Sequence, residues 1–148
     1  CCGCRWSGGC HAGDDLRMIR LATEQDILWL IEQMLIVKST TAWKDVPGAY
    51  HADTLRPFLL NQLRAADSVC YVWDDPVDAF CGVTYGRMHV PPHLPYVFEW
   101  GWAGPPKHAV ACWRACTHWA TRRGAVLACR SVSQPGVSIR ETLTWERL

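Results

Sequence analysis

The most constraining feature of the sequence is the junction at residues 99–113, which reads EWGWAGPPKHAVACW. Large aromatic residues alternate with small or acidic ones up to Ala103, and this period of two predicts a strand. The Gly-Pro-Pro turn at 104–106 ends the alternation, and proline suits the first turn of a helix. Because another apolar strand follows at Val126–Val132, the segment predicts a right-handed strand–helix–strand crossover with parallel strands.

The strand before this turn has two unlike faces, because successive side chains of a strand point to opposite sides. One face is expected to be filled by aromatic rings, and the other to be nearly bare except for a carboxylate. Small residues on a strand allow another backbone or a ligand to come close. The filled face comprises Tyr96, Phe98, Trp100 and Trp102, and the bare face comprises Val97, Glu99, Gly101 and Ala103.

The helix start after the turn could hold an anion. Free N–H groups at a helix N-terminus favour negative charge, and Lys107 adds a positive charge at the same place. Pro105 and Pro106, however, remove two donors that a phosphate site would use. The junction is therefore either an anion site or only a turn.

The remaining patterns complete a single mixed α/β (α+β) domain with the order β-α-α-β-β-β-α-β-α. The middle strands are joined by short turns and are expected to be antiparallel. Thr23 is expected to cap the first helix, and Asp53 or Thr54 the second. The expected strands are 18–22, 68–73, 79–89, 96–103 and 126–132, the expected helices are 23–37, 53–65, 105–123 and 138–148, and a loop is expected at 38–49.

Composition limits the classes of function. The chain has 148 residues and a net charge of +1, which favours one globular domain and gives no electrostatic reason to expect nucleic acid or an anionic membrane as partner. No apolar run approaches the roughly 18 residues of a membrane span. The nine cysteines are odd in number and no secretory signal precedes them, so we expect reduced thiols and a cytoplasmic protein.

Four of these cysteines crowd residues 1–17, which show no hydrophobic period. The cluster C-C-x-C-x5-C-H could bind zinc, but it lacks the two separated ligand pairs of a zinc ribbon or finger. We therefore expect no metal, and we interpret 1–17 as an extension and 18–148 as the domain.

The element order, the opening Met18-Ile-Arg-Leu-Ala-Thr-x-x-Asp26 and the junction at 99–113 together resemble the GNAT superfamily of N-acetyltransferases. The resemblance covers residues 18–148 in outline and rests more on the arrangement of elements than on motif identity. Within the family, the chain is most similar in general character to compact phage-encoded members. The resemblance implies that the fourth strand, 96–103, splays from the fifth, 126–132, and that the pantetheine arm of acetyl-CoA lies between them.

The resemblance also implies roles for individual residues. Glu99 lies where several members keep a carboxylate that deprotonates the acceptor amine. Residues 101–103 would offer backbone to pantetheine, and residues 104–109 would approach the pyrophosphate. The candidate cofactor contacts are Gly101, Trp102, Ala103, Gly104, Lys107, His108, Ala109, Ser138 and Trp145, and the candidate acceptor contacts are Trp43, Tyr50 and His51.

The sequence departs from the family pattern at two places. The phosphate loop carries Pro105-Pro106 instead of the family's glycines. In the last helix Ser138 would stand for a family Asn and Trp145 for a family Tyr, and an indole cannot usefully protonate the CoA thiolate. The chain stops at Leu148, where the family continues with closing strands, so a C-terminally truncated fragment is one interpretation.

Two functions therefore stay open. The first is an acetyl-CoA-dependent N-acyltransferase that moves an acetyl group by direct attack to a primary amine of a small molecule or peptide. The second is an inactive GNAT-like phage structural or accessory protein, located in the virion. Glu99 itself is either the base or a structural residue that pairs with a basic neighbour such as Arg87. The aromatic residues near 43–51 either contact the acceptor or only cover the sheet.

Overall fold

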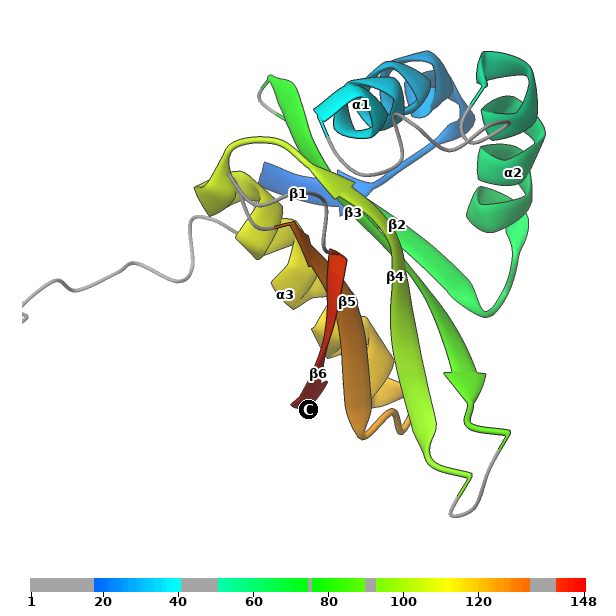
Figure 1. The fold of residues 1–148 in the computed structure, drawn as a ribbon, viewed down its shortest axis with the longest axis vertical. Helices are drawn as coiled ribbons and strands as arrows, with labels where there is room; N and C mark the ends of the chain where they lie inside the picture. The colour runs from blue at the N-terminus through cyan, green and yellow to red at the C-terminus, as the bar shows by residue number, and fades with distance from the viewer. Residues whose placement is uncertain (1–17, 41–50, 75, 90–92, 134–140) are drawn as a thin grey trace, which may run out of the picture.

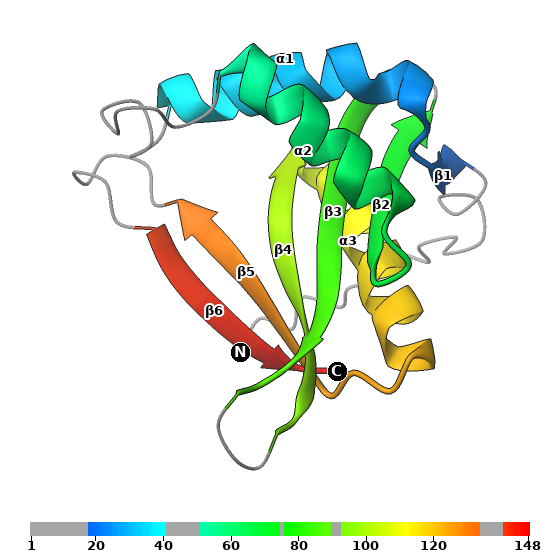
Figure 2. The same cartoon turned by 90° about the vertical axis from the view of Figure 1, so that its right-hand side faces the viewer.

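The computed structural model describes residues 18–40, 51–74, 76–89, 93–133 and 141–148. These residues form a six-stranded mixed sheet with α1 and α2 on one face and α3 on the other (Figure 1, Figure 2), which confirms the α/β class. The elements are β1 (Ile19–Leu21), the short 3-10 helix η2 (Glu24–Asp26), α1 (Ile27–Thr40), α2 (Ala52–Arg64), β2 (Ser68–Asp74), β3 (Val77–Arg87), β4 (Pro95–Ala103), α3 (Pro106–Arg122), β5 (Leu127–Ser133) and β6 (Glu141–Arg147).

The strands lie in the sheet in chain order, from β1 to β6. Every neighbouring pair is antiparallel except β4 and β5, which are parallel and are connected by α3. The predicted antiparallel middle strands and the predicted parallel crossover are both confirmed.

Two apolar cores lie on the two faces of the sheet because β2 and β3 are buried on both sides. Phe80 packs with α1 and α2, whereas its neighbour Cys81 packs under α3, and both are fully buried. The predicted α1 stripe is confirmed at Ile27, Leu30 and other residues of the same face. Burial of such side chains is the main favourable term in folding.

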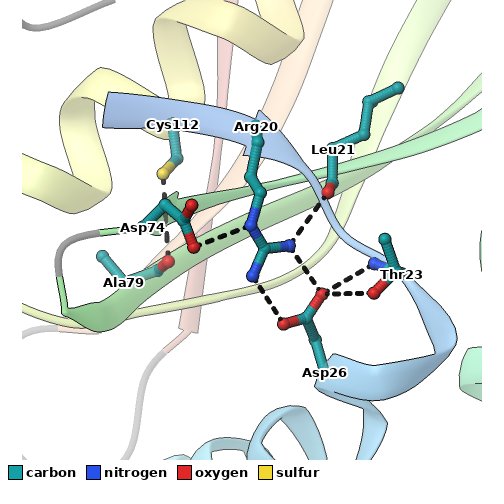
Figure 3. Close-up of polar contacts among 7 residues, drawn as sticks. All are labelled: Arg20, Leu21, Thr23, Asp26, Asp74, Ala79 and Cys112. Atoms are coloured by element: carbon teal, nitrogen blue, oxygen red, sulfur yellow. Dashed lines mark hydrogen bonds and ion pairs between the residues drawn. The ribbon is translucent and has the colours of Figure 1, made fainter. Parts of the chain in front are cut away.

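An ion-pair network joins the short helix η2 to β1 and β2 (Figure 3). The Arg20 guanidinium on β1 donates from Nη1 and Nη2 to the two Asp26 oxygens, at 2.8 and 2.9 Å, and from Nε to Asp74 Oδ1 at 2.7 Å. The Thr23 amide donates to Asp26 Oδ2 at 2.7 Å, which gives the capping arrangement that the sequence predicts before α1. Arg20, followed by Thr23, lowers the pKa of Asp26, although burial opposes this shift.

The last predicted element is wrong, because residues 141–147 form a strand and not a helix. The apolar residues Leu143 and Trp145 are also compatible with alternation, and threonines separate and flank them. Threonine and aromatic residues favour strands, and pairing with the whole length of β5 prevails over the helical pattern.

Two helix boundaries also differ from expectation. The first helix continues to Thr40, into the segment predicted as loop. The second helix begins one residue after His51, whose carbonyl accepts hydrogen bonds from the amides of Thr54 and Leu55, so neither Asp53 nor Thr54 is the cap. Pro57 consequently lies inside the helix rather than in its first turn.

The Cys-rich stretch 1–17 lies outside the described residues, and its predicted status as an extension stays a prediction. Within the described segments, no three His, Cys, Asp or Glu side chains are grouped so that they could hold a metal ion. None of the described helices is long and apolar enough to cross a membrane.

Candidate functional site

The strands β4 and β5 pair over a short length and then diverge. Tyr96, Val97 and Phe98 pair with residues 127–129, and no pair follows. Beyond this point β4 stays with β3 as far as Ala103, and β5 stays with β6 as far as Ser133. We call the diverging segments, residues 99–103 and 130–133, the fork (Figure 2). The backbone groups of β4 that face the fork have no strand partner on β5.

A bulge in β4 lies at the beginning of the fork. Val83 of β3 is opposite Glu99 and Gly82 is opposite Gly101, so Trp100 is an extra residue without a partner in β3. A bulge of this kind reverses the sides to which the following residues point. The Trp100 ring packs toward α2, 5.7 Å from the Phe58 ring.

The predicted division of β4 into a filled and a bare face is therefore wrong. Trp102 lies on the α3 side with Val97, whereas Trp100 and Ala103 lie on the α1 and α2 side. The face that carries Glu99 is not bare, because Val97 is fully buried and Glu99 is only 6% exposed.

Glu99 is positioned where the two strands separate. It follows the last β4–β5 pair, and its side chain lies on the α3 side, as does that of its β3 partner Val83. Glu99 directly follows Phe98, the partner of Cys129 on β5. Burial and, to a smaller extent, the negative charge of Glu99 raise the pKa of the Cys129 thiol. Buried carboxylates are uncommon and mark candidate catalytic sites.

The basic neighbour that the predicted alternative named, Arg87, does not form an ion pair with Glu99. Arg87 lies four residues along β3 from the Val83 position that faces Glu99, which is about 13 Å by strand rise. The described ion pairs include none between these two side chains.

The N-terminus of α3 follows the end of β4 through a tight turn. Gly104 has a φ of 115°, and a Cβ at this position would lie 2.4 Å from the Asp78 carbonyl oxygen, so only glycine fits without strain. The helix begins at Pro106, and the Ala109 amide donates to the Pro105 carbonyl at 2.9 Å. The amides of Lys107 and His108 point out of the N-terminal end, as first-turn amides do.

The His108 side chain is directed away from the fork. Its Nδ1 lies 2.9 Å from both Asp78 oxygens, and its ring stacks on Trp73 with the centroids 4.1 Å apart. Asp78 and Trp73 belong to β3 and β2, the part of the sheet away from β5. The backbone of His108, rather than its ring, is therefore the group that could contact a phosphate.

The other predicted site residues are dispersed or lie outside the described part of the chain. Trp145 is on β6 instead of a helix, is 45% exposed, and lies with its ring 5.6 Å from that of Tyr96. His51 caps α2. Trp43, Tyr50 and Ser138 fall on residues that the structure does not describe, so their roles stay predictions.

The sequence interpretation missed Arg130. This arginine is the first β5 residue beyond the last pair with β4, and its guanidinium carbon lies 5.9 Å from the Trp102 ring and 5.7 Å from the Trp113 ring. A signal was present, because Arg130 is a lone charge in the strand Leu-Ala-Cys-Arg-Ser-Val.

No protein-family model matches the sequence, and no curated protein matches it. Solved structures do match its fold. The aminoglycoside 6'-N-acetyltransferase AAC(6')-Ih from Acinetobacter baumannii aligns at 12% identity with a TM-score of 0.59, over 80% of each chain. AAC(6')-Iy in complex with a bisubstrate analog aligns at 17% identity with a TM-score of 0.59, again over 80% of each chain.

A predicted acetyltransferase from Clostridium acetobutylicum, crystallised with acetyl-CoA, is similarly related. It aligns at 15% identity with a TM-score of 0.59, over 80% of this chain and 82% of its own. Together with the parallel β4–β5 pair that opens into the fork and the helix α3 that connects these strands, these likenesses establish that the chain has the fold of the GNAT N-acetyltransferases.

Proposed function

We propose that the protein is an acyl-CoA-dependent N-acyltransferase, and that acetyl-CoA is a donor. The observation that carries the proposal is the separation of β4 from β5 after Phe98 and Cys129, beside the N-terminus of α3. A pantetheine arm could form strand-like hydrogen bonds with the fork-facing backbone of β4. Its pyrophosphate could then meet the first-turn amides of α3 and the Lys107 charge, since helix N-termini favour anions.

The reaction would be a direct transfer. The nitrogen of a neutral amine attacks the thioester carbonyl carbon, so that an N–C bond forms and the C–S bond breaks. Glu99 accepts the proton that the amine loses, and coenzyme A leaves as a thiolate that takes a proton from solvent. Backbone N–H groups of β4 would polarise the carbonyl, and holding both reactants at the fork would supply much of the acceleration.

The acceptor is proposed as a primary amine on a small molecule or short peptide. Two of the structural neighbours described above, AAC(6')-Ih and AAC(6')-Iy, are named as aminoglycoside N-acetyltransferases. Aminoglycosides, polyamines and short peptides therefore make the first panel of acceptors.

A thermal melt with and without acetyl-CoA tests whether the protein binds this donor. A ligand at 100 times its Kd adds about 2.7 kcal/mol to stability, which for a domain of this size raises Tm by about 10 °C. An unchanged Tm at millimolar acetyl-CoA would remove acetyl-CoA as a donor, and an unchanged Tm with free coenzyme A as well would reject the acyltransferase.

Substitution of Glu99→Gln tests whether Glu99 is the general base of the transfer. We expect kcat to fall at least about 100-fold, because the base is lost while the shape of the side chain is kept. Glu24→Gln is the matched control, since Glu24 is an exposed carboxylate on η2 far from the fork. Equal turnover of the Glu99→Gln and Glu24→Gln variants would remove Glu99 as base.

The competing proposal is an inactive GNAT-like accessory or virion protein. Its specific support is the helix start, where neither Pro105 nor Pro106 has an N–H to offer a phosphate. This proposal predicts a folded protein whose melt does not respond to acetyl-CoA or to free coenzyme A.

A further inference from the structure

Arg130 reaches across the fork on the α3 side. Its backbone belongs to β5, yet its guanidinium lies near both the Trp102 ring on β4 and the Trp113 ring on α3, at 5.9 and 5.7 Å. The side chain therefore bridges the two diverging strands beneath the helix. A group bound between the strands would lie against this cation.

The bridging side chain carries an unsatisfied donor. The Nε–H of Arg130 is buried and has no hydrogen-bond partner in the part of the chain that the structure describes, and none of the described ion pairs involves Arg130. A buried donor without an acceptor is costly, and each such group in a folded protein calls for an explanation. Contact with two tryptophan rings stabilises the positive charge, but a ring face does not accept a hydrogen bond as an oxygen does.

The position of this cation within the fork argues against the phosphates as its partner. Trp113 is seven residues after Pro106, which is about 10 Å along the helix from the N-terminus. The Arg130 backbone follows the last β4–β5 pair, at the closed end of the fork, and its side chain extends from there toward Trp102. If the donor binds as proposed above, its phosphates lie at the open end and its acyl group lies at the closed end.

We propose that Arg130 selects donors whose acyl group ends in a carboxylate, such as malonyl-, succinyl- or glutaryl-CoA. This inference rests on the proposed function and names the donor class for the same site. A carboxylate accepts hydrogen bonds from the Arg130 Nε–H and the adjacent Nη–H in the bidentate geometry that suits arginine. The transfer itself is unchanged: the acyl carbon exchanges its bond to sulfur for one to nitrogen, and the distal carboxylate does not react.

The test is isothermal titration of the full chain with coenzyme A, acetyl-CoA, malonyl-CoA, succinyl-CoA and glutaryl-CoA. We expect at least one carboxylated donor to bind the wild type about tenfold or more tightly than acetyl-CoA, as a charge-assisted pair allows. In Arg130→Met this ratio of affinities should fall to about one. Arg130→Lys keeps the positive charge but cannot donate two parallel hydrogen bonds to a carboxylate. It should give an intermediate ratio, and it serves as the second variant should Arg130→Met not fold.

Arg123→Met is the matched control. Arg123 also lies over a tryptophan, with its guanidinium 4.5 Å from the Trp119 ring, but it is exposed at the C-terminal end of α3. This variant should keep the wild-type ratio.

The outcomes separate the two proposals. If acetyl-CoA binds and no carboxylated donor binds more tightly, the donor class is wrong and the acyltransferase survives. If Arg130→Met keeps the preference, Arg130 is not its source and the inference is overturned. If neither acetyl-CoA nor any carboxylated donor binds, the proposed function fails, and this inference fails with it.

Discussion

Replacing Asp26 with asparagine should destabilise the protein and change how its stability depends on pH. Asp26 accepts two hydrogen bonds from Arg20 and two from Thr23, all between 2.7 and 3.0 Å. Asparagine keeps one oxygen but turns an NH₂ toward a donor. The substitution therefore removes hydrogen bonds from a position where the Asp26 side chain is only 9% exposed to solvent.

The magnitude follows from the two partners' exposure. Removing one partner of a fully buried ion pair costs about 3–5 kcal/mol, whereas an exposed pair contributes about 0–1 kcal/mol. The Arg20 side chain is 36% exposed, so solvent screens this pair in part. We therefore expect Asp26→Asn to lower the free energy of unfolding by about 2 kcal/mol, and Tm by roughly 8 °C.

The pH dependence has a defined sign. The pKa of Asp26 is lowered in the folded protein, chiefly by the Arg20 hydrogen bonds. The stabilisation is therefore complete above the unfolded-state pKa, near 3.8, and is lost as the pH falls through the lower folded-state pKa. The gap in stability between wild type and Asp26→Asn should be full at pH 7 and should shrink below about pH 4.

Urea unfolding at pH 7 and at acid pH measures this gap. Glu24→Gln is the control, because the Glu24–Arg64 pair is equally short, at 2.7 Å, but both side chains are more than half exposed. It should cost less than about 0.5 kcal/mol. The reasoning is refuted if Asp26→Asn costs no more than Glu24→Gln, or if the gap is the same at both pH values.

Further predictions concern the turn, the helix and the buried thiols. Gly104→Ala should cost about 1–3 kcal/mol more in urea unfolding than Gly124→Ala, because a Cβ meets the Asp78 carbonyl oxygen at the first site and nothing within 4 Å at the second, although both have positive φ. Trp113→Phe should cost roughly 1 kcal/mol in the same assay, because the indole N–H loses its 2.8 Å hydrogen bond to Glu146. The Cys112 thiol should resist iodoacetamide at pH 8 until the protein is unfolded, as read by peptide mass spectrometry, because burial raises its pKa to about 12; rapid labelling of the native protein would contradict this.

The sequence predicted the elements whose pattern is long and unambiguous. The alternation around Phe80 and the stripe through Leu30 specify a strand and a helix, and the Gly-Pro-Pro turn specifies the crossover. It failed at β6, where a short segment fits both periods and pairing with β5 decides. Local pattern carries no information on such pairing.

The details of the site were harder to predict for a different reason. The bulge at Trp100 depends on how β4 and β3 align, and it moves Trp102 to the opposite face from the one that strict alternation gives. Arg130 meets Trp102 and Trp113 only after three elements have packed. Contacts between distant segments leave no spacing in the sequence, so an isolated arginine in a strand was the only sign.

The separation of β4 from β5 after Phe98 needs a physical cause. Two strands that begin to pair in parallel would gain hydrogen bonds by continuing, so something must offset the loss after Phe98. The structure offers two causes. The Arg130 side chain contacts Trp102 and Trp113 on the α3 side of the sheet, and the hydrogen bond from Trp113 to Glu146 ties β6 to α3. What remains along β4 is backbone without a strand partner on β5, which the proposed function uses to bind the pantetheine arm. Because backbone hydrogen bonds need no particular side chain, binding along this backbone would place little constraint on the sequence of β4.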